Sequence, residues 1–226
     1  MIRSRLHYSG ALLRPQGRPD RNARVRPARH LVIFARYPTA GGGKHRLAAT
    51  VGAIQALRFQ RARLSVLLAR LSHDPRWTTW LAVTPDRSGP WPVHSGTVSQ
   101  GRGDLGARLA RVFRAVPPGP VVIIGTDIPG VDAPRIAAAF RALAGNDAVF
   151  GPAPDGGYWL IGLRRAPRLR LPFDDVRWSS VHALADTERN LARARIAHLG
   201  VLEDVDDAGA LQRLGTWARV VAPPDL

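Results

Sequence analysis

Short runs of apolar residues alternate along the chain with longer segments in which apolar residues recur every three or four positions. Residues 31–35, 77–83, 97–99, 121–125, 148–151, 158–163 and 196–201 have the pattern of short, largely buried strands. Residues 47–71, 105–116 and 136–143 have helical periodicity, as do a segment capped by Ser179 or Ser180 and a last one that ends near Trp217. Strands that alternate with helices predict a layered α/β domain with a mostly parallel central sheet.

The first 29 residues differ from the rest. They contain eight arginines and one acidic residue, with glycines and prolines but no periodicity, which predicts a disordered Arg-rich extension (1–29). An organelle transit peptide and a wrongly assigned start codon fit this composition equally well. Residues 30–226 are long enough for a single domain with a sizeable core. Because no apolar run approaches the roughly 18 residues of a membrane helix, we expect no membrane span and a cytoplasmic protein.

The net charge of +16 raises the question of whether the protein binds nucleic acid. Beyond the first 29 residues the arginines are spread over the predicted helices, and no ladder of aromatic and basic residues is present. Nucleic acid is therefore an unlikely partner. The absence of cysteine excludes disulfides and thiolate metal sites, and the seven histidines lack the spacing of a zinc site.

A glycine-rich turn follows the first predicted strand and contains the only lysine of the chain. Pro38 ends the strand, and Gly41, Gly42, Gly43 and Lys44 precede the helix. Glycines let the backbone approach an anion closely, and free N–H groups at a helix start point toward it. The turn therefore predicts a phosphate site with Lys44 as a compact charge; a tight turn with a solvated lysine is the alternative. Neither the Walker pattern nor G-x-G-x-x-G fits this segment.

Carboxylates near strand ends are candidate metal ligands. Asp127 follows the predicted strand 121–125, at the end where open α/β sheets bind ligands. Mg²⁺ prefers one or two carboxylates together with substrate phosphates. The alternative is that Asp127 is an N-cap or turn residue for the helix that begins near Pro134. Asp206 lies among four acidic residues in a stretch of five, so it is either a second metal ligand or a helix cap.

Two other glycine-containing segments are candidates for ligand contacts. Gly101, Gly103 and Gly106 permit close approach of a flat or charged group, and Asp104 is a natural N-cap for the helix that follows. Residues 155–157, Asp-Gly-Gly, form a turn signal before the strand 158–163. This turn suits contact with an acceptor, and a plain hairpin explains it nearly as well.

These motifs together resemble those of a known family. The matching stretches are FARYP (34–38), GKHRL (43–47), QGRGDLGARL (100–109), IGTDIP (124–129), GPAPDGGYWLIGL (151–163), WS (178–179) and DVD (204–206). They are similar to the nucleotide-diphospho-sugar-transferase-like proteins of DUF2064, also labelled selenodomain-associated transferase 1 or glycosyltransferase-like. The resemblance covers about residues 31–217. It implies a three-layer, Rossmann-like fold of GT-A type, similar to molybdenum-cofactor and phospholactate guanylyltransferases.

The resemblance also implies roles for individual residues. The nucleotide phosphates would be held by Arg36, Gly41, Gly43, Lys44 and Arg46, whereas Gly103, Gly106 and Arg108 would lie near the base or ribose. Asp127, with Asp206, would hold Mg²⁺ or Mn²⁺, and Lys44 and Asp127 would be the catalytic residues. An acceptor pocket would be lined by Asp155, Tyr158 and Trp178.

The leading hypothesis is a metal-dependent transferase that takes a nucleotide or nucleotide-sugar donor and an unknown small acceptor. Glycosyl and nucleotidyl transfer both need the same phosphate site and carboxylate, so these residues leave the two open. The family usually has threonine where this chain has His45 and Asp207. The substitution at His45 motivates an alternative, a nucleotide-binding regulatory module without turnover, and the net charge motivates a weaker one, a nucleic-acid-binding protein.

Overall fold

The computed structural model describes residues 28–39, 45–86, 89, 91 and 96–203. Within these residues the strands are β1 (His30–Arg36), β2 (Thr78–Thr84), β3 (Thr97–Ser99), β4 (Val121–Gly125), β5 (Ala148–Pro152), β6 (Tyr158–Leu163) and β7 (Ile196–His198). The helices are α1 (His45–Val51), α2 (Ala53–Leu71), α3 (Leu105–Ala115), α4 (Ala133–Gly145) and α5 (Ala183–Arg189).

The described strands form one sheet in the order β3-β2-β1-β4-β6-β5-β7. β1 pairs in parallel with β2 and β4, β2 with β3, and β5 with β7, whereas β6 is antiparallel to its neighbours β4 and β5. The chain thus adds β2 and β3 on one side of β1 and then crosses to the other side with β4. The predicted mostly parallel sheet is confirmed, and the strand order reverses between β1 and β4.

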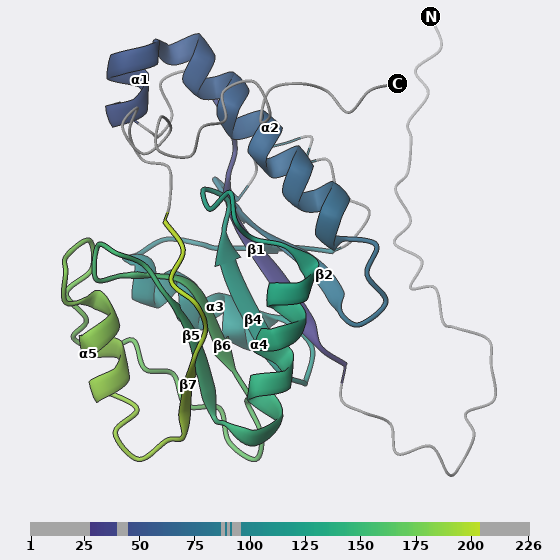
Figure 1. Ribbon diagram of the computed structural model, residues 1–226, viewed down its shortest axis with the longest axis vertical. Helices are drawn as coiled ribbons and strands as arrows, with labels where there is room; N and C mark the ends of the chain where they lie inside the picture. Colours follow the sequence, from purple (N-terminus) through teal and green to yellow (C-terminus); the bar gives the residue numbers. More distant parts are fainter. Residues whose placement is uncertain (1–27, 40–44, 87–88, 90, 92–95, 204–226) are drawn as a thin grey trace, which may run out of the picture.

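Helices cover both faces of the sheet, which gives the three predicted layers (Figure 1). Consecutive residues of β1 point to opposite faces, as the pleat of a strand requires. Ile33 belongs to the core layer with Leu67 of α2 and Phe140 of α4, whereas Val32 belongs to the layer with Phe113 of α3. The segment 169–178 and α5 complete this second layer. The two main core clusters therefore form two layers of side chains, one on each face of the β-sheet.

The helix predicted over 47–71 is in fact two helices, so that prediction was wrong at one point. Gly52 separates α1 from α2 with φ +83°, a left-handed conformation that favours glycine. Its carbonyl accepts the N–H of Ala56 at 3.1 Å, which starts α2. Apolar periodicity continues across the break, and therefore the pattern alone did not reveal it.

Smaller differences concern the C-terminal third. β7 ends at His198 rather than at residue 201. Neither predicted serine caps α5, because its N-cap position is His182, which makes no side-chain capping bond. Ser180 instead closes the preceding turn, where its hydroxyl accepts the N–H of His182 at 3.2 Å. The helix predicted to end near Trp217 lies outside the described residues, as does most of the predicted N-terminal extension.

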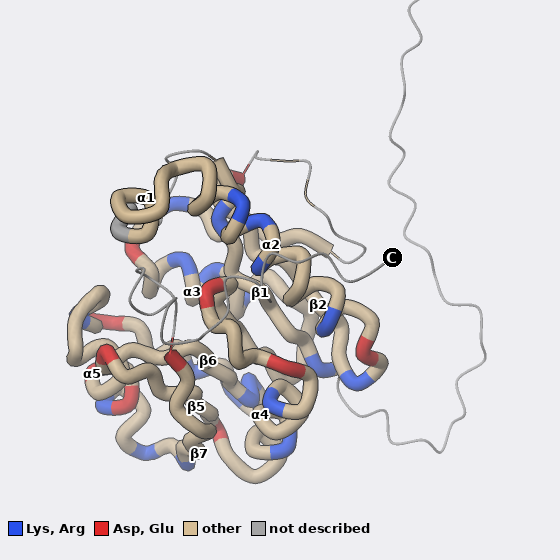
Figure 2. Tube along the Cα trace, turned by 45° about the horizontal axis from the view of Figure 1, so that its top comes forward, with Lys and Arg blue, Asp and Glu red and all other residues tan. Residues whose placement is uncertain are grey.

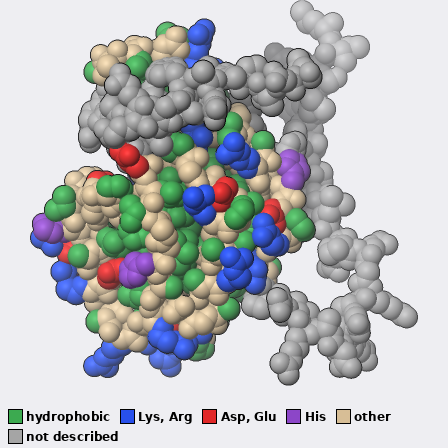
Figure 3. All heavy atoms as spheres, viewed as in Figure 1, with side chains coloured by type: hydrophobic (Ala, Val, Ile, Leu, Met, Phe, Trp, Pro, Cys, Tyr) green, Lys and Arg blue, Asp and Glu red, His purple; other side chains and the backbone are tan. Residues whose placement is uncertain are grey.

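Among the described helices, none combines the length and apolarity needed to cross a membrane. Figure 2 shows arginine positions on several elements around the fold. On the face seen in Figure 3, apolar side chains lie between separate groups of arginines. In these views the positive charge of the described chain is divided among several surfaces.

Candidate functional site

The parallel strands bring their carboxyl ends to one edge of the sheet. In the register, Arg36 of β1 lies beside Thr84 of β2, and Phe34 lies beside Gly125 of β4. Asp127 follows β4 by two residues. Arg36 and Asp127 therefore flank the point where the strand order reverses, and the crevice outside such a point is where open α/β sheets bind ligands.

Gln100, directly after β3, makes hydrogen bonds to several elements at this edge of the sheet. Its side chain is 1% exposed, and its amide nitrogen donates to the carbonyl oxygens of Ala35 at 3.0 Å and Ala82 at 2.7 Å. Its amide oxygen accepts a hydrogen bond from Arg108. One buried side chain thus links the ends of β1 and β2 and orients a predicted nucleotide-binding arginine.

Arg108 lies close to other cations at the end of β1. Its guanidinium carbon is 5.6 Å from the centre of the Phe34 ring, a cation–π distance. Burial lowers the pKa of Arg108, and the positive charges of Arg36 and Arg111 lower it further. Arg36 and Arg108 therefore lie near enough for their positive charges to repel each other, and two cations so placed suit an anionic ligand. A guanidinium remains protonated at neutral pH despite such a shift.

The predicted carboxylate at the end of β4 has a specific environment. The Thr126 hydroxyl donates to Asp127 at 3.1 Å. Arg63 of α2, 3% exposed, donates to the carbonyl of Ile128 at 2.9 Å. Burial lowers the pKa of Arg63, the charge of Arg70 adds to this effect, and the charge of Asp127 opposes it. A buried cation therefore faces the turn that carries Asp127.

Asp127 does not cap the next helix, so that part of the alternative is wrong, whereas a role as a turn residue stays open. Asp132 occupies the N-cap position of α4 and accepts the N–H of Arg135 at 2.9 Å. Asp127 and Thr126 together offer oxygen donors of the hard kind that Mg²⁺ and Mn²⁺ bind. In the described part of the chain no group of three metal-binding side chains occurs. The donors present fit a cation that takes one carboxylate and completes its coordination with water and phosphate.

The loop that leads into α3 is shaped by local packing. Asp104 caps α3 as predicted and accepts the N–H of Ala107 at 2.8 Å. Gly103 has φ +108°, which favours glycine, and it is exposed. Gly106 is buried, and a Cβ there would lie 3.0 Å from the Trp178 ring. Packing alone thus accounts for Gly106, and the contacts of both glycines with a base or ribose stay predictions.

Two of the three residues predicted to line an acceptor pocket lie in different surroundings. Asp155 is exposed in the turn between β5 and β6, where it accepts the N–H of Gly157 at 2.9 Å. This turn lies at the same edge as Asp127, because β6 runs antiparallel to β4. Tyr158 instead packs edge-on against Phe150, with ring centres 5.3 Å apart. Burial raises the pKa of the Tyr158 phenol, so the group stays protonated.

Comparison with known proteins agrees with this architecture. A family model described as "Uncharacterized protein conserved in bacteria (DUF2064)" matches residues 55–180. The chain belongs to DUF2064. The matched residues include Arg108, Asp127, Asp155, Tyr158 and Trp178. No curated protein matches the chain.

Solved structures resemble this DUF2064 protein over most of its length. A proposed nucleotide-diphospho-sugar transferase from Desulfovibrio desulfuricans G20 is 26% identical, with a TM-score of 0.74, over 84% of this chain and 89% of its own. The 4-diphosphocytidyl-2C-methyl-D-erythritol synthase from Anaerococcus prevotii is 11% identical, with a TM-score of 0.52, over 84% of this chain and 99% of its own. The latter likeness concerns the fold alone. The predicted Rossmann-like fold of GT-A type is confirmed.

Several predicted site residues of the DUF2064 protein fall outside the described residues. They are Gly41, Gly43, Lys44 and Asp206, and the side chain of Arg46. Arg36, Gly103, Arg108, Asp127 and Asp155 are described, and strand direction places the elements that carry them at one edge of the sheet.

Sequence reasoning missed two residues of this region. Arg63 lies in the helix predicted over 47–71, where an arginine is expected on the polar side, but it occupies a core-facing position of α2. Its spacing of four residues from Phe59 and from Leu67, both buried in α2, was the available signal. Gln100 was noted only as part of a motif, because no local pattern distinguishes a buried glutamine from an exposed one.

Proposed function

We propose that this DUF2064 protein is a divalent-metal-dependent transferase that uses a nucleotide or nucleotide-sugar donor. The observation that carries the proposal is that Arg36 and Arg108, near the end of β1, and Asp127, after β4, lie at the same edge of the sheet, where the strand order reverses. Cations on one side suit phosphates, and a carboxylate on the other suits the metal that accompanies them. The likeness to the Desulfovibrio desulfuricans protein supports the same assignment.

Each residue has a defined task in this proposal. Arg36 and Arg108 bind phosphate oxygens, and Gln100 holds Arg108 in place through its amide oxygen. Asp127, with Asp206, holds Mg²⁺ or Mn²⁺, which when bound neutralises charge on the phosphates as the leaving group departs. Lys44 adds a charge on the same phosphates. Asp155, in the turn before β6, contacts the acceptor.

Binding measurements test the donor site. Calorimetry with nucleoside triphosphates and nucleotide sugars, in the presence of Mg²⁺ or Mn²⁺, should show metal-dependent affinity in the wild type. Asp127→Asn and Lys44→Ala should each weaken binding at least about tenfold. Asp74→Asn is a matched control, because Asp74 precedes β2 at the opposite edge of the sheet and has the same charge. Unchanged affinity in both site variants would show that the donor binds elsewhere.

Turnover separates the transferase from a module that only binds. The wild type, mixed with the donors that bind and with phosphorylated small acceptors, should release nucleoside diphosphate in glycosyl transfer or diphosphate in nucleotidyl transfer. Chromatography identifies which of the two products appears. Donor binding without either product, across the whole acceptor panel, would favour the regulatory module.

A further inference from the structure

A cavity lined by charged residues lies at the edge of the sheet opposite the proposed donor site. Its floor includes Leu163 at the end of β6, which lies beside Val121 at the start of β4 and Ala148 at the start of β5. The carboxyl ends of β1 and β4 are at the other edge. The cavity has a volume of about 260 Å³ and takes no part in the proposed transfer reaction.

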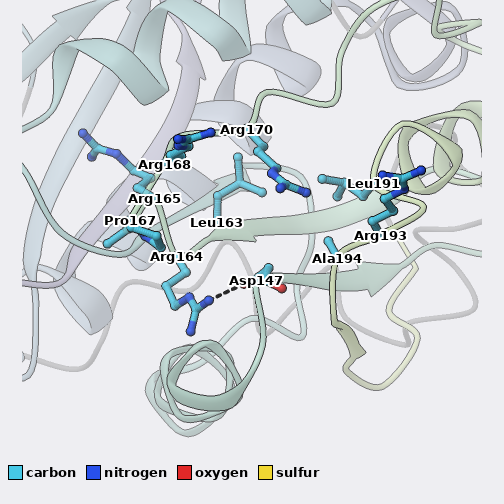
Figure 4. Close-up of a pocket in the computed structure, with 11 residues that line it drawn as sticks. Asp147, Leu163, Arg164, Arg165, Pro167, Arg168, Arg170, Leu191, Arg193 and Ala194 are labelled. Atoms are coloured by element: carbon cyan, nitrogen blue, oxygen red, sulfur yellow. Dashed lines mark hydrogen bonds and ion pairs between the residues drawn. The ribbon is translucent and has the colours of Figure 1, made fainter.

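One wall of this cavity comes from a segment in which arginine and leucine alternate. Residues 168–171 read Arg-Leu-Arg-Leu in a segment that is neither helix nor strand. Leu169 and Leu171 are half-buried against the core layer of α3, whereas Arg168 and Arg170 are exposed. Burial thus alternates along the segment, so the leucines anchor it to the core and the arginines line the cavity. Arg193, after α5, is exposed on the other side of the cavity, near Leu191 (Figure 4).

Five arginines and one acid line the cavity, but two of the arginines already have partners. Arg164 pairs with Asp147 (Figure 4). Asp147 also accepts the backbone N–H of Arg195 at 2.9 Å, and this hydrogen bond, together with the charge of Arg164, lowers its pKa. Arg165 donates to the carbonyl oxygens of Val116 and Pro117 at 3.1 and 2.9 Å. The only carboxylate among the described lining residues is thus occupied.

Three guanidinium groups remain without a counter-charge. Within the described part of the chain, Arg168, Arg170 and Arg193 make no hydrogen bond or ion pair. Like charges gathered around a concave site repel each other and attract anions. Leu163 and Leu191 are buried and form the apolar floor of the cavity, whereas the three arginines are exposed.

We propose that this cavity, which we call the arginine pocket, binds a phosphate-class oxyanion such as inorganic phosphate, diphosphate or the phosphate of a small molecule. The planar fork of a guanidinium matches the oxygens of a phosphate group. The volume of about 260 Å³ is smaller than the roughly 300–1,000 Å³ of typical small-molecule pockets, which favours a compact anion over a whole nucleotide. The pocket is independent of the donor site.

Titrations of the full-length protein with phosphate and with diphosphate test this proposal. They are done without divalent metal and at constant ionic strength, by calorimetry and by thermal shift, because an anion that binds only the folded state raises its stability. Replacement of Arg168, Arg170 and Arg193 by glutamine should weaken binding at least about a hundredfold, since three charge-assisted contacts are lost. A nucleoside monophosphate in a parallel titration shows whether the phosphate is recognised free or as part of a larger molecule.

Matched controls separate this pocket from general charge effects and from the donor site. The triple replacement of Arg58, Arg61 and Arg141 by glutamine removes the same charge from exposed positions of α2 and α4, and phosphate binding should stay within about twofold of the wild type. Asp127→Asn should also leave it unchanged. Equal losses in the two triple variants would overturn the proposal. A response of the pocket variant to duplex nucleic acid alone, with no small-anion binding in the wild type, would overturn it as well.

Discussion

Gln100→Leu is expected to destabilise the protein far more than its small change in size suggests. The substitution removes two donors from the buried carbonyl oxygens of Ala35 and Ala82, and it removes the acceptor of Arg108. A buried polar group that loses its partner costs about 1–3 kcal/mol. Each carbonyl also has a second lone pair, and Arg108 is near the surface, so we take the lower part of that range for each of the three groups. Leucine recovers about 1 kcal/mol through its apolar side chain.

The expected net loss is therefore about 2–4 kcal/mol in the free energy of unfolding, a large fraction of the roughly 5–15 kcal/mol of a typical domain. For a domain of this size the melting temperature should fall by roughly 5–15 °C. Urea unfolding followed by tryptophan fluorescence measures the loss directly. Gln55→Leu is the matched control, because Gln55 is exposed on α2 and leucine favours helix at least as well as glutamine. The control should change stability by less than about 0.5 kcal/mol.

Gln100→Glu distinguishes the hydrogen bonds from the shape of the side chain. Glutamate keeps the size and an acceptor for Arg108, but its carboxylate faces two carbonyl oxygens that need donors. We expect at least as large a loss as with leucine at neutral pH, and a smaller one at acidic pH, where the protonated carboxyl can donate once. Stability of Gln100→Leu within about 0.5 kcal/mol of the Gln55→Leu control would refute the reasoning.

The remaining predictions concern single residues elsewhere. Gly156→Ala should lower the free energy of unfolding by about 2 kcal/mol or more, because Gly156 has φ +82° and a Cβ would lie 2.2 Å from the Val181 carbonyl oxygen. Gly145 has open space around it, so Gly145→Ala should be neutral or stabilising when measured by the same urea unfolding. Burial lowers the pKa of His30, against the opposing hydrogen bond to the Pro118 carbonyl. The folded protein therefore binds a proton at His30 less readily than the unfolded chain does. The stability that His30 contributes is fully present above about pH 6.5 and is lost as the pH falls toward the lower pKa of the folded state. His30→Gln should make the free energy of unfolding depend less on pH in this range. Arg63→Met should lower the free energy of unfolding by about 1–3 kcal/mol, because the buried carbonyl of Ile128 loses its donor. It should also weaken metal-dependent donor binding by calorimetry, whereas Arg58→Met on the exposed side of α2 should change neither.

The strands and most helices were predictable because their signals are local. An apolar run such as Val-Val-Ile-Ile at 121–124 strongly favours a buried strand, and β4 is one. Asp104 correctly predicted where α3 begins. The strand order was not predictable in the same way. It depends on pairings such as that of Ile124 with Leu160, and nothing in either segment specifies its partner. Only the general arrangement of an α/β sheet allowed Asp127 to be placed at the ligand-binding edge.

Polar residues in core-facing positions are the main reason why the site was predicted incompletely. A single arginine among leucines is normally assigned to the solvent side of a helix, and that assignment failed for Arg63 because the carbonyl of Ile128 and the charge of Asp127 compensate its burial. These partners lie 65 and 64 positions away in the chain. The compensation exists only in the folded protein, so sequence periodicity could not indicate it.

Two buried nitrogen atoms connect these observations to the proposed donor site. The Nε atoms of Arg63 and Arg108 are buried and have no hydrogen-bond partner in the described structure, and each such donor costs about 1–3 kcal/mol. Arg63 contacts the turn after β4, and Arg108 contacts the end of β1, so the two lie beside the strands that flank the reversal of strand order. Native proteins rarely leave such groups unpaired unless a ligand, an ion or water completes them. Because α2 and α3 cover opposite faces of the sheet, the two nitrogen atoms need separate acceptors, and for Arg108 at the proposed donor site a phosphate oxygen would be a suitable one.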